Sequence, residues 1–231
     1  MKDFRIRCSA IGKIMTNSRT KGQLSKTCQS YLEDYAIENM YGYSKDIWSK
    51  AIDKGIAVED ASIELAEEVL KMGAMSKNEE FYENEYLTGT PDVLNEDFVL
   101  DVKSSYDATT FPWFKKDVPN KDYYFQLQGY MELTGRRNSY LVYCLVDTPS
   151  DIVEDEVRRV HYKLKEIDDN PIVRNAVEMQ HNFERVPKEQ RIKCFEIDYD
   201  PEAIKKIYER VEECREYYET LIHEQFKAQE A

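Results

Sequence analysis

The chain has 231 residues, of which 42% are hydrophobic and 33% charged, and this balance excludes both a disordered and a fibrous protein. It carries 45 acidic against 32 basic side chains, a net charge of −13, and no apolar run approaches the roughly 20 residues of a membrane span. We therefore expect a cytoplasmic globular protein without a signal peptide or membrane contact. Five scattered cysteines without a Cys-x-x-Cys pair argue against a zinc or iron–sulfur site, and we expect reduced thiols.

The charges are unevenly distributed. Residues 1–30 contain one acidic residue, Asp3, and seven basic ones: Lys2, Arg5, Arg7, Lys13, Arg19, Lys21 and Lys26. The acidic excess therefore lies entirely in the rest of the chain. This asymmetry favours a local anionic partner such as nucleic acid, and the alternative is a solvated basic stretch that binds nothing.

The first half of the chain changes from helical to strand-like patterns. Helices are expected over residues 25–40, before a Tyr-Gly-Tyr break, and over residues 53–72, ending at Gly73. Three strands of an antiparallel meander should follow at 79–83, 86–94 and 98–105. Residues 107–116 should form a short helix or a loop.

The second half begins with a helix over 123–134 that Gly135 ends, and continues with a buried apolar strand over 139–146. The remaining expected elements are a strand at 153–164, a helical stretch at 167–186, a short strand at 194–197 and a helix at 201–227. The order of helices and strands predicts an α/β fold with a mixed sheet at its centre. We expect one domain over 1–231, comprising a basic helical part (1–50), a core (51–147) and a strand with C-terminal helices (148–231).

Two carboxylates and a lysine form the first candidate site. Asp101 and Lys103 share one face of their strand, while Val102 points the other way into the core. A hairpin would bring Asp92, in the sequence Thr-Pro-Asp, beside Asp101. Oxygen ligands of this kind suit Mg²⁺ or Mn²⁺, although a surface turn and an exposed strand edge are the simpler alternative.

Glu59 interrupts an otherwise apolar helical stripe. The stripe comprises Ile56, Glu59, Ile63, Ala66 and Leu70, at spacings of three and four residues. A carboxylate there is costly to bury unless it is paired or bound to a cation, and the alternative is a side chain that reaches out to water.

Gln126 and Tyr130 share one face of the helix expected over 123–134. An amide between aromatic rings can hydrogen-bond a phosphate or orient a lysine. Aromatic residues on a helix are more often core, so this motif only supports the others.

Five elements in this order resemble the lambda-type alkaline exonucleases, also called YqaJ-like viral recombinases, of the restriction-endonuclease-like superfamily. They are Arg7-Cys-Ser-Ala-Ile-Gly-Lys-Ile-Met-Thr16, Gly55-x-x-x-Glu59, Gly89-Thr-Pro-Asp92, Asp101-Val-Lys103 and Gln126-Leu-Gln128. The resemblance covers roughly residues 4–147 and implies a restriction-endonuclease-like core, with a central mixed β-sheet flanked by helices.

The resemblance assigns a role to each matching position. Glu59, Asp92 and Asp101 would bind the metal ions together with the Val102 carbonyl, and Lys103 would position or deprotonate the attacking water. Gln126 would be the active-site glutamine. The residues that would contact DNA and its 5′-phosphate are Ser9, Arg19, Thr90, Arg7 and Lys13.

Two positions depart from the family pattern. Asp101 stands where glutamate is commoner, which shortens the ligand arm by one methylene. The additional upstream arginine of the phosphate pocket has no clear counterpart, because Arg5, Arg7 and Lys2 are all candidates for it.

The implied activity is 5′→3′ degradation of linear double-stranded DNA to mononucleotides in phage-type recombination. The implied cofactor is Mg²⁺ or Mn²⁺, with two ions per site, which can activate water and stabilise the leaving oxygen. The implied partners are DNA ends, a single-strand-annealing recombinase and two further copies in a trimer. The alternatives are an endonuclease or structure-specific nuclease of the same superfamily, and a catalytically idle DNA-binding protein.

Overall fold

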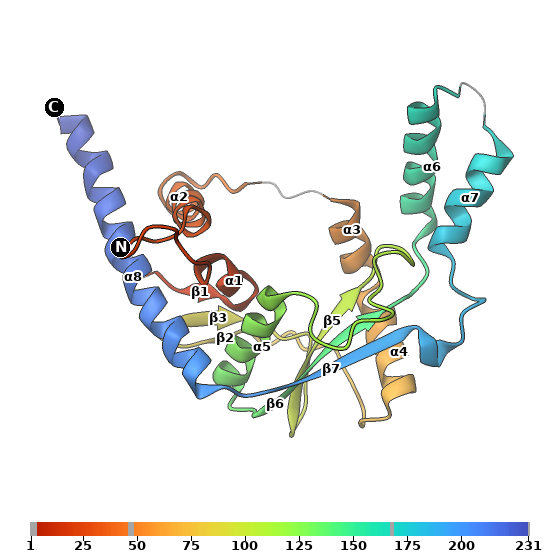
Figure 1. Ribbon diagram of the computed structural model, residues 1–231, viewed down its shortest axis with the longest axis horizontal. Helices are drawn as coiled ribbons and strands as arrows, with labels where there is room; N and C mark the ends of the chain where they lie inside the picture. The colour runs from red at the N-terminus through yellow and green to blue at the C-terminus, as the bar shows by residue number, and fades with distance from the viewer. Residues whose placement is uncertain (1–3, 46–48, 167–168, 231) are drawn as a thin grey trace.

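The computed structural model describes residues 4–45, 49–166 and 169–230. It shows a mixed α/β fold with two small sheets near the middle of the molecule and helices around them (Figure 1). This confirms the expected fold class. Lys2 and the start of the helix expected at Ile167 lie outside the described residues. No helix in the described ranges combines the length and the apolar character needed to cross a membrane.

The larger sheet is mixed and has the order β4-β5-β6-β7. Its strands are β4 (Val93–Leu94), β5 (Phe98–Ser104), β6 (Asn138–Cys144) and β7 (Ile192–Asp198). β5 runs parallel to β6, and the two outer pairs are antiparallel. Both central strands were expected from their apolar runs, and β7 confirms the short strand near Cys194.

Helices cover both faces of β5. Val99 packs in one apolar cluster with Leu127 of α5 (Lys121–Thr134), whereas Leu100 and Val102 pack in another with Ile63 of α4 (Glu59–Leu70). Successive side chains of a strand point to opposite faces, so this packing turns Asp101 and Lys103 toward α5. The predicted face assignment of β5 is therefore confirmed.

The smaller sheet has the order β1-β3-β2, from β1 (Ile6–Arg7), β3 (Leu87–Gly89) and β2 (Tyr82–Glu83). The single strand predicted over 86–94 is wrong, because its halves become β3 and β4 in different sheets. Pro91 lacks an N–H for a ladder, and Asp92 turns its carboxylate to accept a hydrogen bond from the Val102 N–H. The predicted three-stranded meander is accordingly divided between the two sheets.

The helix predicted over 53–72 is also divided. It consists of α3 (Lys50–Ala57) and α4, which meet at the buried Val58, and it ends at Lys71 with φ +54 rather than at Gly73. The break exposes 70% of Ile56, so the predicted apolar stripe holds only within α4. It also places Glu59 in the first turn of α4, where a negative charge complements the helix dipole.

The N-terminal part forms a short 3₁₀ turn (Cys8–Ala10), α1 (Ile11–Ile14) and α2 (Lys26–Tyr41). The Ser25 hydroxyl caps α2 by accepting from the Cys28 N–H at 3.1 Å, and Gly42 ends it with φ +74. This confirms the helix and the break expected there. All five cysteines are free.

The strand predicted over 153–164 is wrong: these residues belong to α6 (Ser150–Leu164). Val153, Val157, Val160 and Leu164 recur at spacings of four and three, which is helical, and Val157 packs as a buried residue. α7 (Pro171–His181) and α8 (Pro201–Glu230) are helical as expected, separated by the short turn Lys188–Gln190 and β7. Residues 107–116 form a loop. The Asp107 carboxylate stabilises its start by accepting hydrogen bonds from the Thr109 and Thr110 N–H groups.

Gly129 of α5 touches the N-terminal turn. A Cβ on Gly129 would lie 2.7 Å from both Cys8 Sγ and Ile11 Cδ1, two fully buried side chains with no room to move. We expect Gly129→Ala to lower the free energy of unfolding by about 1–3 kcal/mol, measured by thermal and urea denaturation. Gly55→Ala is the matched control, because nothing lies within 4 Å of its Cβ and alanine favours the helix. Equal stability of the two variants would contradict the close packing.

Candidate functional site

Asp101, Lys103 and Gln126 form a buried polar cluster between β5 and α5. The Lys103 Nζ lies 2.5 Å from Asp101 Oδ2, and the Gln126 Nε2 donates to Asp101 Oδ1 at 2.8 Å. Gln126 also donates to the Tyr130 hydroxyl at 3.0 Å, which fixes its amide. Asp101 is only 1% exposed. The structure therefore brings together three of the predicted catalytic residues, contributed by two elements about 25 residues apart.

Asp92 joins this cluster from the turn between β3 and β4. Its Oδ2 accepts a hydrogen bond from the Val102 N–H at 2.7 Å, across the hairpin that pairs β4 with β5. This places Asp92 beside Asp101, as the sequence predicts. The hairpin thus positions two carboxylates and the adjoining main chain of Val102 at one point.

Burial and mutual repulsion dominate the electrostatics of the two aspartates. Burial raises the pKa of Asp92 to about 7, and the Asp101 charge adds to this, while Lys103 and the Val102 N–H oppose it. Burial also raises the pKa of Asp101, again against the effect of Lys103. The two carboxylates raise the pKa of Lys103, although burial alone would lower it. The cluster therefore holds more negative charge than one lysine neutralises.

Glu59 faces the same cluster but is held by another lysine. The Lys77 Nζ lies 3.1 Å from Glu59 Oε1 and 3.9 Å from Asp60 Oδ1, and Glu59 still acts electrostatically on Asp92 and Asp101. Lys77 reaches this position because its backbone forms an isolated bridge with Val93. Nothing in the sequence around Lys77 indicated it, since the residue lies outside any strand or helix.

The donor set of this cluster suits a hard divalent cation. Asp101 Oδ2 is buried and lies 2.5 Å from the Lys103 ammonium, and no other described residue donates a hydrogen bond to it. The Asp92 carboxylate lies beside it, and oxygen ligands with excess negative charge are what Mg²⁺ and Mn²⁺ prefer. Among the described ranges, no three acidic, histidine or cysteine side chains already form a ligand set, and Glu59 is paired with Lys77.

Ser9 and Thr90 follow two paired strands of the smaller sheet. β1 pairs in parallel with β3, with Arg7 opposite Thr88, so the residues after each strand emerge at the same edge of the sheet. Ser9 follows β1 by two residues, and Thr90 directly follows β3 and precedes Pro91-Asp92. The parallel pairing therefore places Ser9 and Thr90 at the same edge of this sheet, and Thr90 is two residues before Asp92.

The predicted basic residues of the N-terminal part line two neighbouring hollows rather than one. Arg7, Ser9 and Lys13 line the first, between the N-terminal turn and α2. Arg19 lines the second, on the loop before α2. Lys26 and Thr27 border both. Arg7 is 3.6 Å from Glu38 and remains largely exposed.

Lys54 is a buried lysine that the sequence analysis missed. Its Nζ donates to the Ser105 carbonyl at 2.8 Å and the Tyr106 carbonyl at 3.0 Å, and it lies 5.1 Å from the centre of the Phe183 ring. Burial lowers its pKa to about 8. Lys54 therefore ties α3 to the chain directly after β5, the strand that carries Asp101 and Lys103.

Comparison with solved structures gives related proteins over nearly the whole chain. A phage-related exonuclease from Haemophilus somnus 129PT matches with a TM-score of 0.81 and 28% identity, over 96% of this chain and 97% of that one. The alkaline exonuclease LHK-Exo from Laribacter hongkongensis matches with a TM-score of 0.65 and 16% identity, over 100% of this chain and 96% of that one.

LHK-Exo in complex with dAMP matches equally well, with a TM-score of 0.65 and 16% identity over 98% of this chain and 95% of that one. No protein-family model matches the chain, and no curated protein sequence does. The solved exonucleases share the fold of this chain over nearly its whole length. The resemblance to the lambda-type alkaline exonucleases, or YqaJ-like viral recombinases, is thereby confirmed, and the chain has their nuclease fold.

Proposed function

We propose that this protein is a metal-dependent exonuclease that degrades linear double-stranded DNA from the 5′ end to mononucleotides in phage-type recombination. The observation that carries the proposal is the buried cluster of Asp101, Lys103 and Gln126 with Asp92 beside it. The exonucleases with the same fold support a nuclease role. Metal dependence, polarity and the role in recombination are part of the proposal.

Asp92, Asp101 and, after release from Lys77, Glu59 would hold Mg²⁺ or Mn²⁺, two ions in our proposal, with the Val102 carbonyl as a further ligand. Ions bound there would lower the pKa of a water molecule and neutralise charge on the scissile phosphate. Asp101 holds Lys103 in place through their 2.5 Å contact, so the ammonium would stay beside a scissile phosphate bound at this cluster. Gln126 engages one oxygen of Asp101, and the other, which lies 2.5 Å from the Lys103 ammonium, is the one that would act as a ligand.

The N-terminal hydroxyls and cations would receive the DNA end. Ser9 and Thr90 follow the paired strands β1 and β3, Thr90 is two residues before Asp92, and a hydroxyl can donate to a terminal phosphate. Arg7, Lys13 and Arg19 add positive charge in the adjoining hollows. We propose that the end of the duplex enters along this part of the chain and presents its first phosphodiester to the acidic cluster.

The remaining parts of the proposal concern partners. We propose a trimer and a single-strand-annealing recombinase as the assembly partners, and the host cytoplasm as the site of action. LHK-Exo has been solved with dAMP, a mononucleotide. A nucleoside monophosphate is the class of product that we propose for this chain.

The test is degradation of a linear 5′-phosphorylated duplex with Mg²⁺ or Mn²⁺, with EDTA and a closed circular duplex as controls. We expect metal-dependent release of mononucleotides from the linear DNA and an intact circle. Cutting of the circle would indicate an endonuclease instead. No degradation with either ion would indicate a DNA-binding protein without activity, and light scattering would test the trimer independently.

Arg19→Ala should weaken the preference for phosphorylated ends. Removing one charge-assisted contact to a terminal phosphate costs about 1.5–3 kcal/mol, so we expect the ratio of rates on 5′-phosphorylated and 5′-hydroxyl duplexes to fall by about tenfold or more. Competition between the two duplexes in one reaction measures this ratio. Lys205→Ala, on the exposed side of α8, should leave it unchanged. An equal loss of rate on both ends would show that Arg19 does not contact the phosphate.

A further inference from the structure

We propose that the exposed face of α6 is a second DNA-binding surface, which contacts the phosphate backbone of the duplex away from its reacting end. The surface consists of Arg158, Arg159, Tyr162 and Lys163, with Lys165 just beyond the end of the helix, and we call it the α6 basic face. This inference rests on the proposed function. It assigns a role to a helix that the sequence analysis had read as a strand.

The helical geometry gathers these side chains on one side of α6. At about 100° per residue, Arg158, Tyr162, Arg159 and Lys163 occupy adjacent positions around the helix. Val157 and His161 occupy the other side and are buried, and the His161 Nε2 accepts from the Asn170 N–H at the start of α7. α7 therefore covers one side of α6 and leaves the basic side open.

A chain of contacts connects the base of this face to the candidate site. The Lys50 Nζ of α3 lies 3.1 Å from Glu156 Oε2, and the Tyr106 hydroxyl donates to the same oxygen at 3.4 Å. Tyr106 is the second residue after β5, and its carbonyl is one of the two that accept a hydrogen bond from Lys54. Glu156 thus anchors α6 next to the strand that carries Asp101 and Lys103.

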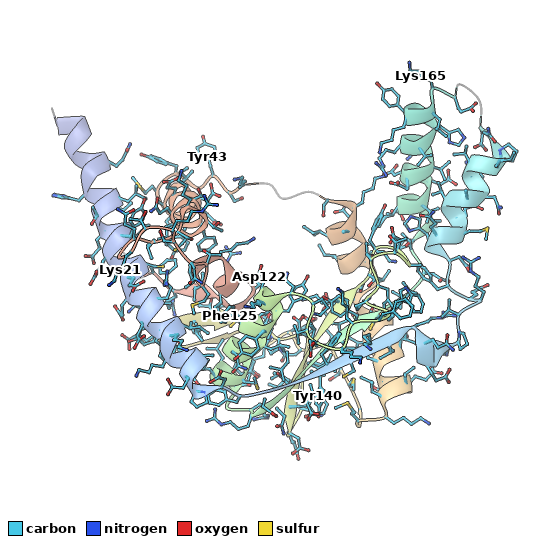
Figure 2. All side chains as sticks on the ribbon, viewed as in Figure 1. Lys21, Tyr43, Asp122, Phe125, Tyr140 and Lys165 are labelled. Atoms are coloured by element: carbon cyan, nitrogen blue, oxygen red, sulfur yellow. The ribbon has the colours of Figure 1, made fainter. Side chains whose placement is uncertain are left out.

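From this anchor the helix projects away from the sheets. Nine residues separate Glu156 from Lys165, a rise of about 14 Å along the helix. Figure 1 shows α6 and α7 as one arm of the molecule and α2 as part of the opposite arm, on the same side of the sheets, with α7 on the outer side of α6. Lys165 lies at the free end of its arm, and Tyr43 marks the other arm (Figure 2). The α6 basic face therefore lies on the arm opposite the one that contains the N-terminal basic residues.

The acidic side chains of α6 lie in its first half and the basic side chains in its second half. Between Val157 and Lys165 there are four basic and no acidic side chains. Arg158 and Arg159 form ion pairs with Asp155 and Glu156, one turn earlier. Lys163 and Lys165 have no ion-pair partner among the described residues, and both are exposed. In a chain with a net charge of −13, two neighbouring lysines without an ion-pair partner at the end of this helix point to a local polyanion.

Tyr162 adds a second observation. Its side chain is 86% exposed between these cations, although a large aromatic residue on a helix normally packs in the core. The helix dipole accounts for cations in the last turn, but it gives no reason for an exposed ring among them. A tyrosine hydroxyl is one of the groups that bind phosphate oxygens in protein–DNA complexes. Cations with a hydroxyl between them suit binding to a DNA phosphate backbone. Such contacts do not distinguish one DNA sequence from another.

The test is binding of a 30-base-pair, 5′-phosphorylated duplex in EDTA, measured by fluorescence anisotropy over a series of salt concentrations. Each phosphate contact contributes a slope of about −0.9 in log K against log salt. We therefore expect the Lys163→Ala/Lys165→Ala variant to lose up to about 1.8 from this slope. Its Kd should rise about tenfold at low salt. Lys205→Ala/Lys206→Ala, two exposed lysines of α8, is the matched control and should bind as the wild type does.

A single substitution separates a specific contact from net charge. Tyr162→Phe removes only the hydroxyl and should weaken binding about two- to tenfold without changing the slope. An unchanged slope and Kd in the lysine variant, with normal binding by the wild type, would overturn the α6 assignment alone. Normal duplex binding with a smaller mass by light scattering would show instead that this face joins copies of the chain. Failure of the wild type to bind or degrade the duplex would overturn the proposed function as well.

Discussion

Asp101→Asn is expected to abolish metal-dependent degradation of linear duplex DNA, with a loss of at least about a thousandfold in rate. Asparagine keeps the size of the side chain and can still accept the hydrogen bond from Gln126, so the fold should remain. It removes the charge that holds Lys103 at 2.5 Å and the buried oxygen that we propose as a metal ligand. One substitution thus disables both the ligand set and the positioned ammonium, which accounts for the size of the effect.

The measurement is the initial rate of mononucleotide release, together with calorimetric titration of Mn²⁺ into the DNA-free protein. Asp97→Asn is the matched control. Asp97 is exposed in the turn before β5, so this variant makes the same chemical change outside the cluster. It should retain wild-type activity and Mn²⁺ affinity. If Asp101→Asn kept more than a tenth of the wild-type rate, Asp101 would not be a metal ligand.

Asp92→Asn is expected to stabilise the metal-free protein at alkaline pH while it removes activity. Burial raises the pKa of Asp92 to about 7 in the folded protein, from an ordinary value near 3.8. A carboxyl group with a raised pKa favours the folded state when it is protonated. Its stabilising contribution is therefore complete below about pH 4 and is lost as the pH rises toward 7 and above.

The full pKa shift of Asp92 corresponds to a change of about 4 kcal/mol in the free energy of unfolding. Because Asp92 and Asp101 titrate together, we assign about 2 kcal/mol of this change to Asp92 alone. Asparagine has no charge to bury and can still accept the Val102 hydrogen bond, so at pH 8 we expect a Tm about 4–8 °C above that of the wild type. Near pH 4 the two proteins should melt together. Added Mg²⁺ should stabilise the wild type only, because the variant lacks a ligand.

Thermal denaturation in EDTA between pH 4 and pH 9 tests this expectation, with Asp97→Asn as the control that should follow the wild type. If wild type and Asp92→Asn showed the same dependence of Tm on pH, the pKa of Asp92 would not be raised in the folded state, by burial or by the Asp101 charge. Such a result would remove the main electrostatic argument for a cation at this site. Stabilisation without loss of activity would show instead that Asp92 is not needed for catalysis.

Local patterns in the sequence determined the parts of the site that depend on one element. The two-residue period of β5 places Asp101 and Lys103 on one face whatever the rest of the chain does. Ser25 and Gly42 bound α2 through hydrogen bonds and backbone angles that involve only their neighbours. Each of the five motifs is also a short local pattern. Their order along the chain was sufficient to indicate the family resemblance that the solved structures confirm.

Local patterns failed where a competing tertiary contact decided the outcome. Residues 86–94 have the composition of one strand, but Asp92 turns toward the Val102 N–H and the chain changes sheets there. Residues 153–164 are rich in valine, yet α6 forms because α7 buries its apolar side. Short apolar patterns fit both a strand and a helix, and only the packing partner distinguishes them.

The tertiary structure alone decided how the site is assembled. It brought Gln126 to Asp101, placed Lys77 on Glu59 and buried Lys54 beneath the end of β5. These contacts join residues that are 18 to 51 positions apart, and their geometry depends on how the helices pack on the sheet. The sequence by itself determined the fold class, the family resemblance and which side chains share a face, because those follow from local periodicity and motif order. Which charges meet was decided by packing, because a charge contacts whatever the folded chain brings within a few ångströms of it.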